Sequence, residues 1–399
     1  MTITMAKINS NYKNLPQTYL FSEIAKKTKV FVEKNPNVEI LKLGIGNTTQ
    51  PLAPVIIEGL TQGVKKLADA KTYTGYGDEQ GNLNLRQELV KWYKKKGITL
   101  QVDEIFISDG AKPDAANISS IFDQKSIVAI SDPVYPVYLD SNIIAGKKIV
   151  YLEALEKNNF FPKPPKQKVD LVFLCSPNNP TGTVATKKQL KDFIDYAKKQ
   201  KAIIIFDAAY SEYISDKNLP SSIYQIEGAK SCAIELQSFS KSAGFTGVRL
   251  GWTIVPKDLQ IEGKENVNKI WNRRQTTMFN GASNIAQLGG LSVLSKEGQK
   301  QTKKQIKYYM ENAKLIKKEL EKIGLKVYGG VNAPYLWVKC PDKLTSWEFF
   351  EKLLNEAHVV STPGSGFGQM GEGFLRLSAF GQKENIKKAL DSIKKNLKI

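Results

Sequence analysis

Residues 169–210 show the architecture of this chain most clearly: VDLVFLCSPNNPTGTVATKKQLKDFIDYAKKQKAIIIFDAAY. Two short apolar runs, LVFLC and AIIIF, flank a segment whose apolar residues recur at helical spacing. Unbroken apolar runs of this length are typical of strands that a parallel sheet buries on both faces. The stretch therefore predicts a strand, a helix and a parallel strand, and ligands bind at the carboxyl ends of such strands.

The same alternation extends from about residue 105 to residue 255. Its β-rich runs are EIFISD, SIVAISD, KKIVYLE, DLVFLCS, AIIIFDAAY, CAIELQS and LGWTIVP. We expect an α/β fold in which helices flank a mostly parallel central sheet. Because 399 residues exceed what one core usually holds, we expect a large domain at 49–290 and a smaller α/β domain at 291–399.

The last hundred residues differ in character from this alternating region. They begin with a long amphipathic helix at about 298–323, followed by short strands such as APYLWVKC and FLRLSAF and by two further helices. We expect these elements to form the smaller domain, and the N-terminal segment at 1–48 to pack with it.

The composition excludes several classes of protein. The start, MTITMAKINSNYKN, lacks the apolar core of a signal peptide, and no apolar run approaches the roughly 18–20 residues that span a bilayer. We therefore expect a cytoplasmic protein without a membrane partner. Cys175, Cys232 and Cys340 form no C-x-x-C pair, which predicts buried thiols and no metal site. The net charge of +19 comes from lysines mixed with acids along helices, which indicates solvated surface rather than a nucleic-acid partner.

Arginine is scarce, and its positions are informative. It occurs only at 86, 249, 273, 274 and 376, so nearly all of the 58 basic residues are lysines. Such a chain keeps arginine where a planar, bidentate donor is needed for phosphate or carboxylate. Arg249 and Arg376 are therefore candidate ligand-binding residues, whereas Arg273 and Arg274 also suit ordinary surface positions.

The segment SFSKSAGFTGVRLGW, residues 238–252, carries the strongest chemical signal. Lys241 lies among small residues between two predicted buried strands, where a lysine has no structural purpose. Its amine can form an imine with a carbonyl cofactor, and Ser238, Ser240 and Arg249 can hold a phosphate. The segment therefore predicts a site for a phosphorylated carbonyl cofactor.

Asp207 follows the AIIIF strand and would bring a carboxylate to the ligand edge of the sheet. A carboxylate beside a pyridine nitrogen keeps that nitrogen protonated, so that the ring withdraws electrons from the substrate. Tyr210, three residues later, could donate to a ring oxygen. Taken alone, Asp207 could equally be a cap or turn residue.

The sequence ISDGAKPDAAN, residues 107–117, places a glycine turn after a strand and Pro113 at the expected first position of a helix. We expect the free N–H groups of Gly110, Ala111 and Lys112 to face an anion at the start of that helix.

Two further loops carry candidate residues. Tyr135 lies between two prolines in SDPVYPVY and could stack on a pyridine ring. Asn179 precedes a proline in CSPNNPTG and could donate to the ring oxygen. Either segment could also be ordinary loop structure.

In this order, the segments resemble the fold-type I aminotransferases, which share a phosphate loop, a stacking aromatic residue, N-P-T-G, D-x-A-Y, S-x-S-K and R-x-G-W. Within that superfamily the chain is most similar to the LL-diaminopimelate aminotransferases. The likeness runs from about Tyr19 to the C-terminus and includes YGDEQG, SDGAK, FNGASN, NAPYLWV and HVVSTPGSGFG. It implies transamination between LL-diaminopimelate and 2-oxoglutarate, giving tetrahydrodipicolinate and glutamate, in lysine biosynthesis.

The resemblance also implies pyridoxal 5′-phosphate as the cofactor and a role for each matching residue. Lys241 would be the catalytic lysine, Asp207 the partner of the ring nitrogen and Tyr135 the stacking ring. Arg376 would bind the substrate α-carboxylate. The remaining cofactor-binding residues would be Tyr76 of the neighbouring subunit, Ala111, Lys112, Asn179, Tyr210, Ser238, Ser240, Arg249 and Asn280.

Diaminopimelate carries a second ammonium and a second carboxylate, so its distal pocket needs charges of both signs. The resemblance implies a homodimer in which Glu79 and Asn280 reach this pocket from the other subunit. Glu79 could also be a surface acid at the start of a helix. The complete substrate-binding set would be Tyr19, Gly46, Glu79, Lys112, Tyr135, Asn179, Asn280 and Arg376.

The departures from the family pattern are local, and several functions remain open. Ser242 follows the catalytic lysine where a tyrosine is common in the family. The rivals are an aminotransferase specific for lysine, aspartate or aromatic amino acids, a carbon–sulfur lyase, and a non-enzymatic relative that binds nucleic acid. A chain of this length has no room for an added DNA-binding module, which argues against the last of these.

Overall fold

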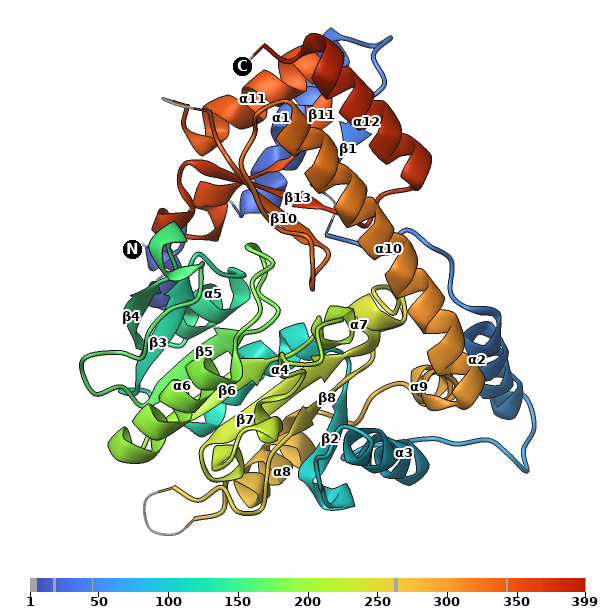
Figure 1. Cartoon of the computed structure of the whole chain (residues 1–399). Coiled ribbons are helices and arrows are strands. Elements are labelled where there is room, and N and C mark those ends of the chain that lie inside the picture. Colours follow the sequence, from blue (N-terminus) through green and yellow to red (C-terminus); the bar gives the residue numbers. More distant parts are fainter. Residues whose placement is uncertain (1–5, 17–18, 45, 262–264, 342–343, 399) are drawn as a thin grey trace, which may run out of the picture.

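The computed structural model describes residues 6–16, 19–44, 46–261, 265–341 and 344–398. Its centre is a seven-stranded sheet in the order β2-β8-β7-β6-β5-β3-β4 (Figure 1). The strands from β7 to β4 run parallel, whereas β8 is antiparallel to both of its neighbours, so the predicted mostly parallel sheet is confirmed. Their bounds are β2 Ile105–Ser108, β3 Ile127–Asp132, β4 Lys148–Glu153, β5 Leu171–Cys175, β6 Ile203–Asp207, β7 Ala233–Ser238 and β8 Gly251–Ile254.

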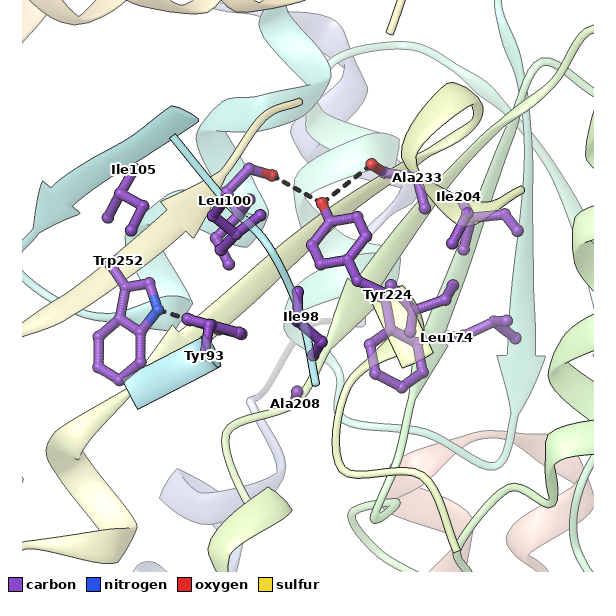
Figure 2. Packing of buried hydrophobic residues seen from close by; sticks show 14 of the residues in the cluster. Tyr93, Ile98, Leu100, Ile105, Leu174, Ile204, Ala208, Tyr224, Ala233 and Trp252 are labelled. Carbon is purple, nitrogen blue, oxygen red and sulfur yellow. Dashed lines mark hydrogen bonds between the residues drawn. The ribbon is translucent and has the colours of Figure 1, made fainter. Parts of the chain in front are cut away.

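Helices cover both faces of this sheet. Along β6, Ile204 and Phe206 belong to a different buried cluster from Ile203 and Ile205, because successive side chains of a strand point to opposite faces. The first cluster, part of which Figure 2 shows, includes residues of α3 (Leu83–Lys94), α6 (Lys187–Gln200) and α9 (Asn284–Leu294). The second includes residues of α4 (Ala111–Asn117), α5 (Val137–Ile144) and α8 (Val267–Met278).

A further buried cluster forms around the C-terminal part of the chain. It contains a four-stranded sheet in the order β12-β13-β10-β9 and the parallel pair β1-β11. Leu20 and Leu41 belong to the same cluster, so these parts of the N-terminal segment pack with the C-terminal elements. Asn9 and Asn11 instead donate to the carbonyl of Ile144 in α5. The domain boundaries after residues 48 and 290 remain a prediction. The elements are α1 Leu20–Lys34, β1 Leu41–Lys42, β9 Val327–Gly329, β10 Tyr335–Lys339, α11 Ser346–Ala357, β11 Val359–Val360, β12 Thr362–Pro363, β13 Phe374–Ser378 and α12 Lys383–Asn396.

The helix α10 (Lys296–Lys322) joins the two parts of the molecule (Figure 1). Ser295 caps it by accepting a hydrogen bond from the Gly298 N–H. Its first half contacts α9 and α2 (Pro54–Leu67), whereas Ala313, Ile316 and Leu320 in its second half enter the C-terminal cluster.

Three expectations from the composition can be compared with the fold. Cys175, Cys232 and Cys340 are buried and free, so the predicted buried thiols are confirmed. Within the described ranges, none of the helices has the length and apolar character needed to cross a bilayer. Arg274, which also suited an ordinary surface position, lies over the ring of Trp271, with 5.5 Å between the guanidinium carbon and the ring centroid. Its guanidinium donates a hydrogen bond to the side chain of Gln275.

Candidate active site

A cavity of about 520 Å3 lies at the carboxyl ends of β5, β6 and β7. The sequence predicted a ligand site at this edge, and the last residues of the three strands, Cys175, Asp207 and Ser238, all line it. Most of the predicted site residues meet here. They are Tyr19, Gly46, Ala111, Lys112, Tyr135, Asn179, Asp207, Tyr210, Ser238, Ser240, Lys241, Arg249 and Arg376.

Lys241 enters the cavity from the short helix α7 (Phe239–Ser242), which begins directly after β7. Ser238 caps this helix by accepting from the Ser240 N–H, and the Lys241 amine donates to the carbonyl of Gly46. Burial lowers the pKa of Lys241 to about 7, and the nearby cations Arg376 and Arg249 act in the same direction. A large fraction of this amine is therefore neutral at neutral pH, and a neutral amine is a nucleophile and a base.

Asp207 ends β6 with a carboxylate that is 7% exposed. One oxygen accepts from the Tyr138 hydroxyl at 2.6 Å and the other from the Ala209 N–H at 2.9 Å. Burial raises the pKa of Asp207, whereas these two hydrogen bonds lower it. Among the described residues no lysine or arginine pairs with Asp207, so the carboxylate is available to a cationic group in the cavity.

Ser238, Ser240 and Arg249 form a polar corner of the cavity. The two serine hydroxyls lie 2.9 Å apart, and Arg249 donates to Ser240 Oγ at 3.4 Å. Arg249 has a φ of +68°, a left-handed conformation that non-glycine residues adopt rarely and mostly at functional sites. A Cβ on Gly110 would lie 2.4 Å from an Arg249 nitrogen and would displace the end of this side chain, and the φ of +130° at Gly110 also favours glycine.

The helix start beside this corner differs in one detail from the prediction. α4 begins at Ala111 with Gly110 as its N-cap, so Pro113 is the third helical residue and not the first. Proline is accepted there because the first N–H groups of a helix have no partner within the helix. The predicted turn itself is present, with Gly110 at a φ of +130°.

Arg376 is almost fully buried, at 1% exposure, on β13. It donates to Asn179 Oδ1 at 2.8 Å and to the Gly44 carbonyl at 3.1 Å, and its buried Nε has no hydrogen-bond partner. Within the part of the chain that the structure describes, no acid forms an ion pair with it. A buried arginine is costly unless an anion pairs with it, so this side chain fits a carboxylate ligand.

Tyr135, Tyr19 and Lys112 lie together at another side of the cavity. The Lys112 ammonium is 5.7 Å from the centroid of the Tyr19 ring and 5.9 Å from that of the Tyr135 ring. Burial raises the pKa of Tyr135 to about 12, so its ring is neutral at physiological pH. Lys112 and Arg376 both lie within electrostatic reach of Tyr135, so two of the cationic groups of the cavity are near this one aromatic ring.

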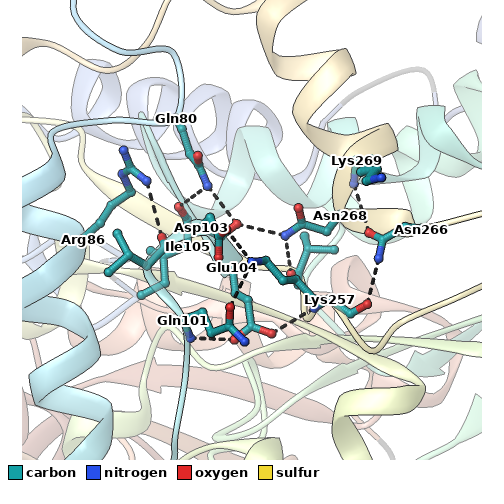
Figure 3. A network of polar contacts seen from close by, with 12 residues as sticks. Gln80, Arg86, Gln101, Asp103, Glu104, Ile105, Lys257, Asn266, Asn268 and Lys269 are labelled. Carbon is teal, nitrogen blue, oxygen red and sulfur yellow. Dashed lines mark hydrogen bonds and ion pairs between the residues drawn. The ribbon is translucent and has the colours of Figure 1, made fainter.

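Tyr76, Glu79 and Asn280 do not line the cavity of a single chain. Tyr76 is 88% exposed and Asn280 is exposed. Their two loops nevertheless lie side by side, because a Cβ on Gly281 would be 3.7 Å from the Cα of Glu79. Arg86 of α3 pairs with Asp78 of the first loop at 2.7 Å. Gln80 of this loop donates to the carbonyl of Ile105 in β2 and so joins the loop to the large sheet (Figure 3).

Tyr138 and Tyr335 are two cavity residues that were not predicted from the sequence and whose hydroxyl groups bond predicted site residues. Tyr138, in the first turn of α5, donates a hydrogen bond to Asp207. Its position three residues after Tyr135, at the start of a helix, could have indicated that it belongs to the site. Tyr335, the first residue of β10, bonds Tyr210 across the cavity, and nothing local in the sequence indicates this contact.

These residues fit pyridoxal phosphate. The polar corner at Ser238, Ser240 and Arg249, with the tight approach of Gly110, suits a phosphate. Asp207 suits a protonated ring nitrogen, and the partly neutral Lys241 amine suits a carbonyl carbon.

The chain belongs to the aminotransferase class I and II family, whose profile it matches over residues 38–393. It is 52% identical to the LL-diaminopimelate aminotransferase of Agathobacter rectalis, covering 98% of this chain and the whole of that protein. The LL-diaminopimelate aminotransferase of Lachnospira eligens is 51% identical over the same shares. The solved structure of the Chlamydomonas reinhardtii LL-diaminopimelate aminotransferase superposes with a TM-score of 0.93 at 46% identity, covering 99% of both chains. The predicted fold and the predicted cofactor of the family, pyridoxal phosphate, are confirmed.

Proposed function

We propose that this aminotransferase interconverts LL-diaminopimelate and 2-oxoglutarate with tetrahydrodipicolinate and glutamate. The full-length similarity to LL-diaminopimelate aminotransferases supports this specificity. The structural observation that carries it is that one cavity contains two cations near Tyr135. Arg376 is buried and forms no ion pair with an acid among the described residues, and Lys112 lies beside the Tyr135 ring. A substrate with two carboxylates matches these two charges, whereas a monocarboxylic amino acid would leave one of them unused.

The proposed roles follow from the contacts of each side chain. Arg376 binds the substrate α-carboxylate with its guanidinium, which Asn179 and the Gly44 carbonyl orient. Asp207 keeps a proton on the cofactor ring nitrogen. When bound, the cofactor supplies an electron sink for the negative charge that develops at the substrate Cα. The neutral Nζ of Lys241 takes the proton from that Cα, because its pKa of about 7 suits a general base at neutral pH.

The remaining residues hold the reacting groups in place. Tyr135 stacks on the cofactor ring, and Asn179 and Tyr210 contact its 3′-oxygen. Ser238, Ser240, Arg249 and the N–H groups of Ala111 and Lys112 hold the phosphate, and Tyr19 and Gly46 enclose the substrate. These assignments extend the family pattern, residue by residue, to the side chains that line this cavity.

We further propose a homodimer in which Tyr76, Glu79 and Asn280 complete the site of the neighbouring subunit. Several exposed large apolar side chains belong to these loops or to the helices next to them in the chain, and exposed apolar patches mark interaction sites. The exposed side chains belong to α2, to α3, to the C-terminal end of α8 and to the loop between α2 and α3: Ile57, Val64, Leu67, Tyr73, Tyr76, Leu83 and Met278.

The specificity is tested with a panel of amino donors. Purified enzyme is mixed with 2-oxoglutarate and LL-diaminopimelate, meso-diaminopimelate, lysine, aspartate or phenylalanine, and glutamate is measured. We expect selective turnover of the LL isomer in the wild type and none in Lys241→Ala. Turnover of another amino acid alone would overturn the proposed specificity, and rapid turnover in Lys241→Ala would overturn the proposed catalytic lysine.

Shared sites are tested by mixing the inactive variant Lys241→Ala with Glu79→Gln, which should turn over LL-diaminopimelate only weakly, under conditions that exchange subunits. A mixed dimer has one site with an intact Lys241 and an intact Glu79 from the partner, so turnover of LL-diaminopimelate should rise well above that of Glu79→Gln alone. In the control, Lys241→Ala is mixed with Arg376→Ala, whose lesion lies in the same site of its own chain, and activity should stay absent. No recovery in the first mixture, with dimers present by analytical ultracentrifugation, contradicts the shared site.

A further inference from the structure

Tyr335 lies between the residue proposed to bind substrate and a residue proposed to bind the cofactor. It is 1% exposed and begins β10, the neighbour of the strand that carries Arg376. The guanidinium carbon of Arg376 is 4.7 Å from the centroid of the Tyr335 ring, within the range of a cation–π contact. At its other end, the Tyr335 hydroxyl lies 2.8 Å from the hydroxyl of Tyr210.

This hydroxyl pair joins the two parts of the molecule. Tyr210 follows β6 of the seven-stranded sheet, whereas Tyr335 belongs to the four-stranded sheet. Both tyrosines belong to a buried aromatic cluster that also contains Tyr213, Tyr309 and Phe380. A movement of β13, the strand that carries Arg376, would therefore change the contact between Tyr335 and Tyr210.

The direction of the hydrogen bond decides what Tyr210 can do. Each hydroxyl has a single proton, so only one of the two tyrosines can donate to the other. If Tyr210 donated to Tyr335, its proton could not form a hydrogen bond with the cofactor. If Tyr335 donates, Tyr210 accepts and keeps its own proton free for an oxygen in the cavity.

The surrounding charges favour Tyr335 as the donor. Burial raises the pKa of both hydroxyls, that of Tyr210 well above its usual value. The cation of Arg376 lowers the pKa of both tyrosines, but it is the ring of Tyr335 that it contacts, and there its effect comes second only to that of burial. The more acidic hydroxyl is the better donor, and the proximity of Arg376 makes it Tyr335.

We propose that Tyr335 is a positioning residue that donates to Tyr210, so that the Tyr210 proton is directed at the 3′-oxygen of the cofactor and responds to the anion bound by Arg376. A carboxylate on Arg376 neutralises the cation beside the Tyr335 ring and weakens its donation to Tyr210. This inference rests on the roles proposed above for Tyr210 and Arg376.

The test follows the pH midpoint of the absorbance change of the bound cofactor in Tyr335→Phe. A hydrogen-bond donor to the 3′-oxygen stabilises the negative charge on this oxygen after the neighbouring proton has left. A weaker donor therefore raises the pH midpoint of the absorbance change, by about half a pH unit or more. Phenylalanine keeps the ring beneath Arg376 and removes only the hydroxyl. The matched control is Tyr309→Phe, which removes a hydroxyl of the same cluster that bonds the N–H groups of Thr49 and Gln50.

The titration is repeated with saturating pimelate, a dicarboxylate that lacks amino groups and cannot react. We expect pimelate to shift the midpoint in the wild type and in Tyr309→Phe, and to shift it by less than half as much in Tyr335→Phe. A Tyr335→Phe enzyme that titrates and responds to pimelate as the wild type does overturns the inference.

A second variant separates this inference from the assignment beneath it. Tyr210→Phe should raise the midpoint more than Tyr335→Phe does, because it removes the direct donor. If Tyr210→Phe raises the midpoint and Tyr335→Phe does not, the proposed function stands and the role of Tyr335 is wrong. If neither variant changes it, the role of Tyr210 fails, and the role of Tyr335 fails with it.

Discussion

Tyr138 donates its hydroxyl proton to Asp207 across 2.6 Å, and both residues are buried in the lining of the cavity. The same ring stacks on Phe173 and meets Tyr135 edge to face, with centroids 6.0 Å apart. One side chain therefore orients the carboxylate proposed to face the cofactor nitrogen and supports the ring proposed to stack on the cofactor.

Removing this hydroxyl with Tyr138→Phe should lower kcat/KM by about tenfold or more, the value of one hydrogen bond to a charged group. The hydrogen bond lowers the pKa of Asp207, so its loss raises that pKa and weakens the hold on the ring proton. Tyr224→Phe is the control, because its buried hydroxyl bonds the carbonyls of Ala233 and Ile254 away from the cavity (Figure 2). Equal losses in both variants would point to general destabilisation.

The Lys241 amine should react selectively near neutral pH in the cofactor-free enzyme. Its pKa is lowered to about 7, so the amine is protonated and inert below that pH and becomes nucleophilic as the pH rises through it. The measurement is the rate of labelling by trinitrobenzenesulfonate between pH 5 and 9, located by mass spectrometry. Arg376→Leu and Arg249→Leu should each raise the midpoint, because both cations lower it. A wild-type midpoint near that of an exposed lysine would contradict the site electrostatics.

Arg376→Lys tests whether a forked donor or only a positive charge is needed. Lysine keeps the charge but cannot bind a carboxylate through two parallel hydrogen bonds, so we expect kcat/KM to fall about 100-fold for every amino donor. Cofactor affinity, measured by absorbance titration, should stay within about twofold of the wild type. An enzyme with near-normal kcat/KM would show that the α-carboxylate binds elsewhere.

Glu79→Gln should separate the two substrates of the reaction. We expect kcat/KM for LL-diaminopimelate to fall on the order of 30-fold, since its distal ammonium loses a charged partner. The half-reaction with glutamate, which has no distal ammonium, should change by less than about twofold. A matching loss with glutamate would place Glu79 in a general structural role.

The fold could be predicted because its strands have clear local sequence patterns, namely short unbroken apolar runs. LVFLC and AIIIF became β5 and β6, and the polar residues after them met at one edge because parallel strands end together. The start of α4 was misplaced because Pro113 is accepted at any of the first helical positions, and the sequence did not show that Gly110 is the cap.

The site was less predictable where it depends on contacts between distant segments. Tyr335 meets Tyr210 across 125 positions of sequence, and Arg376 meets Asn179 across 197, so neither pair leaves a periodic signal. Arg376 was found because arginine is rare in this chain, whereas tyrosine occurs 16 times and gave no such contrast for Tyr335 or Tyr138. The proposed contribution of Tyr76, Glu79 and Asn280 to a neighbouring site depends on a second chain, and only the family resemblance indicated it in the sequence.

The long helix α10 also has a consequence for how the protein unfolds. At 27 residues it is roughly 40 Å long, and it contributes side chains to the packing of both halves of the molecule. Separation of the halves would fray this helix in its middle and expose apolar surface on each side of the break. We therefore expect unfolding of one half to destabilise the other through this helix, although each half has its own core.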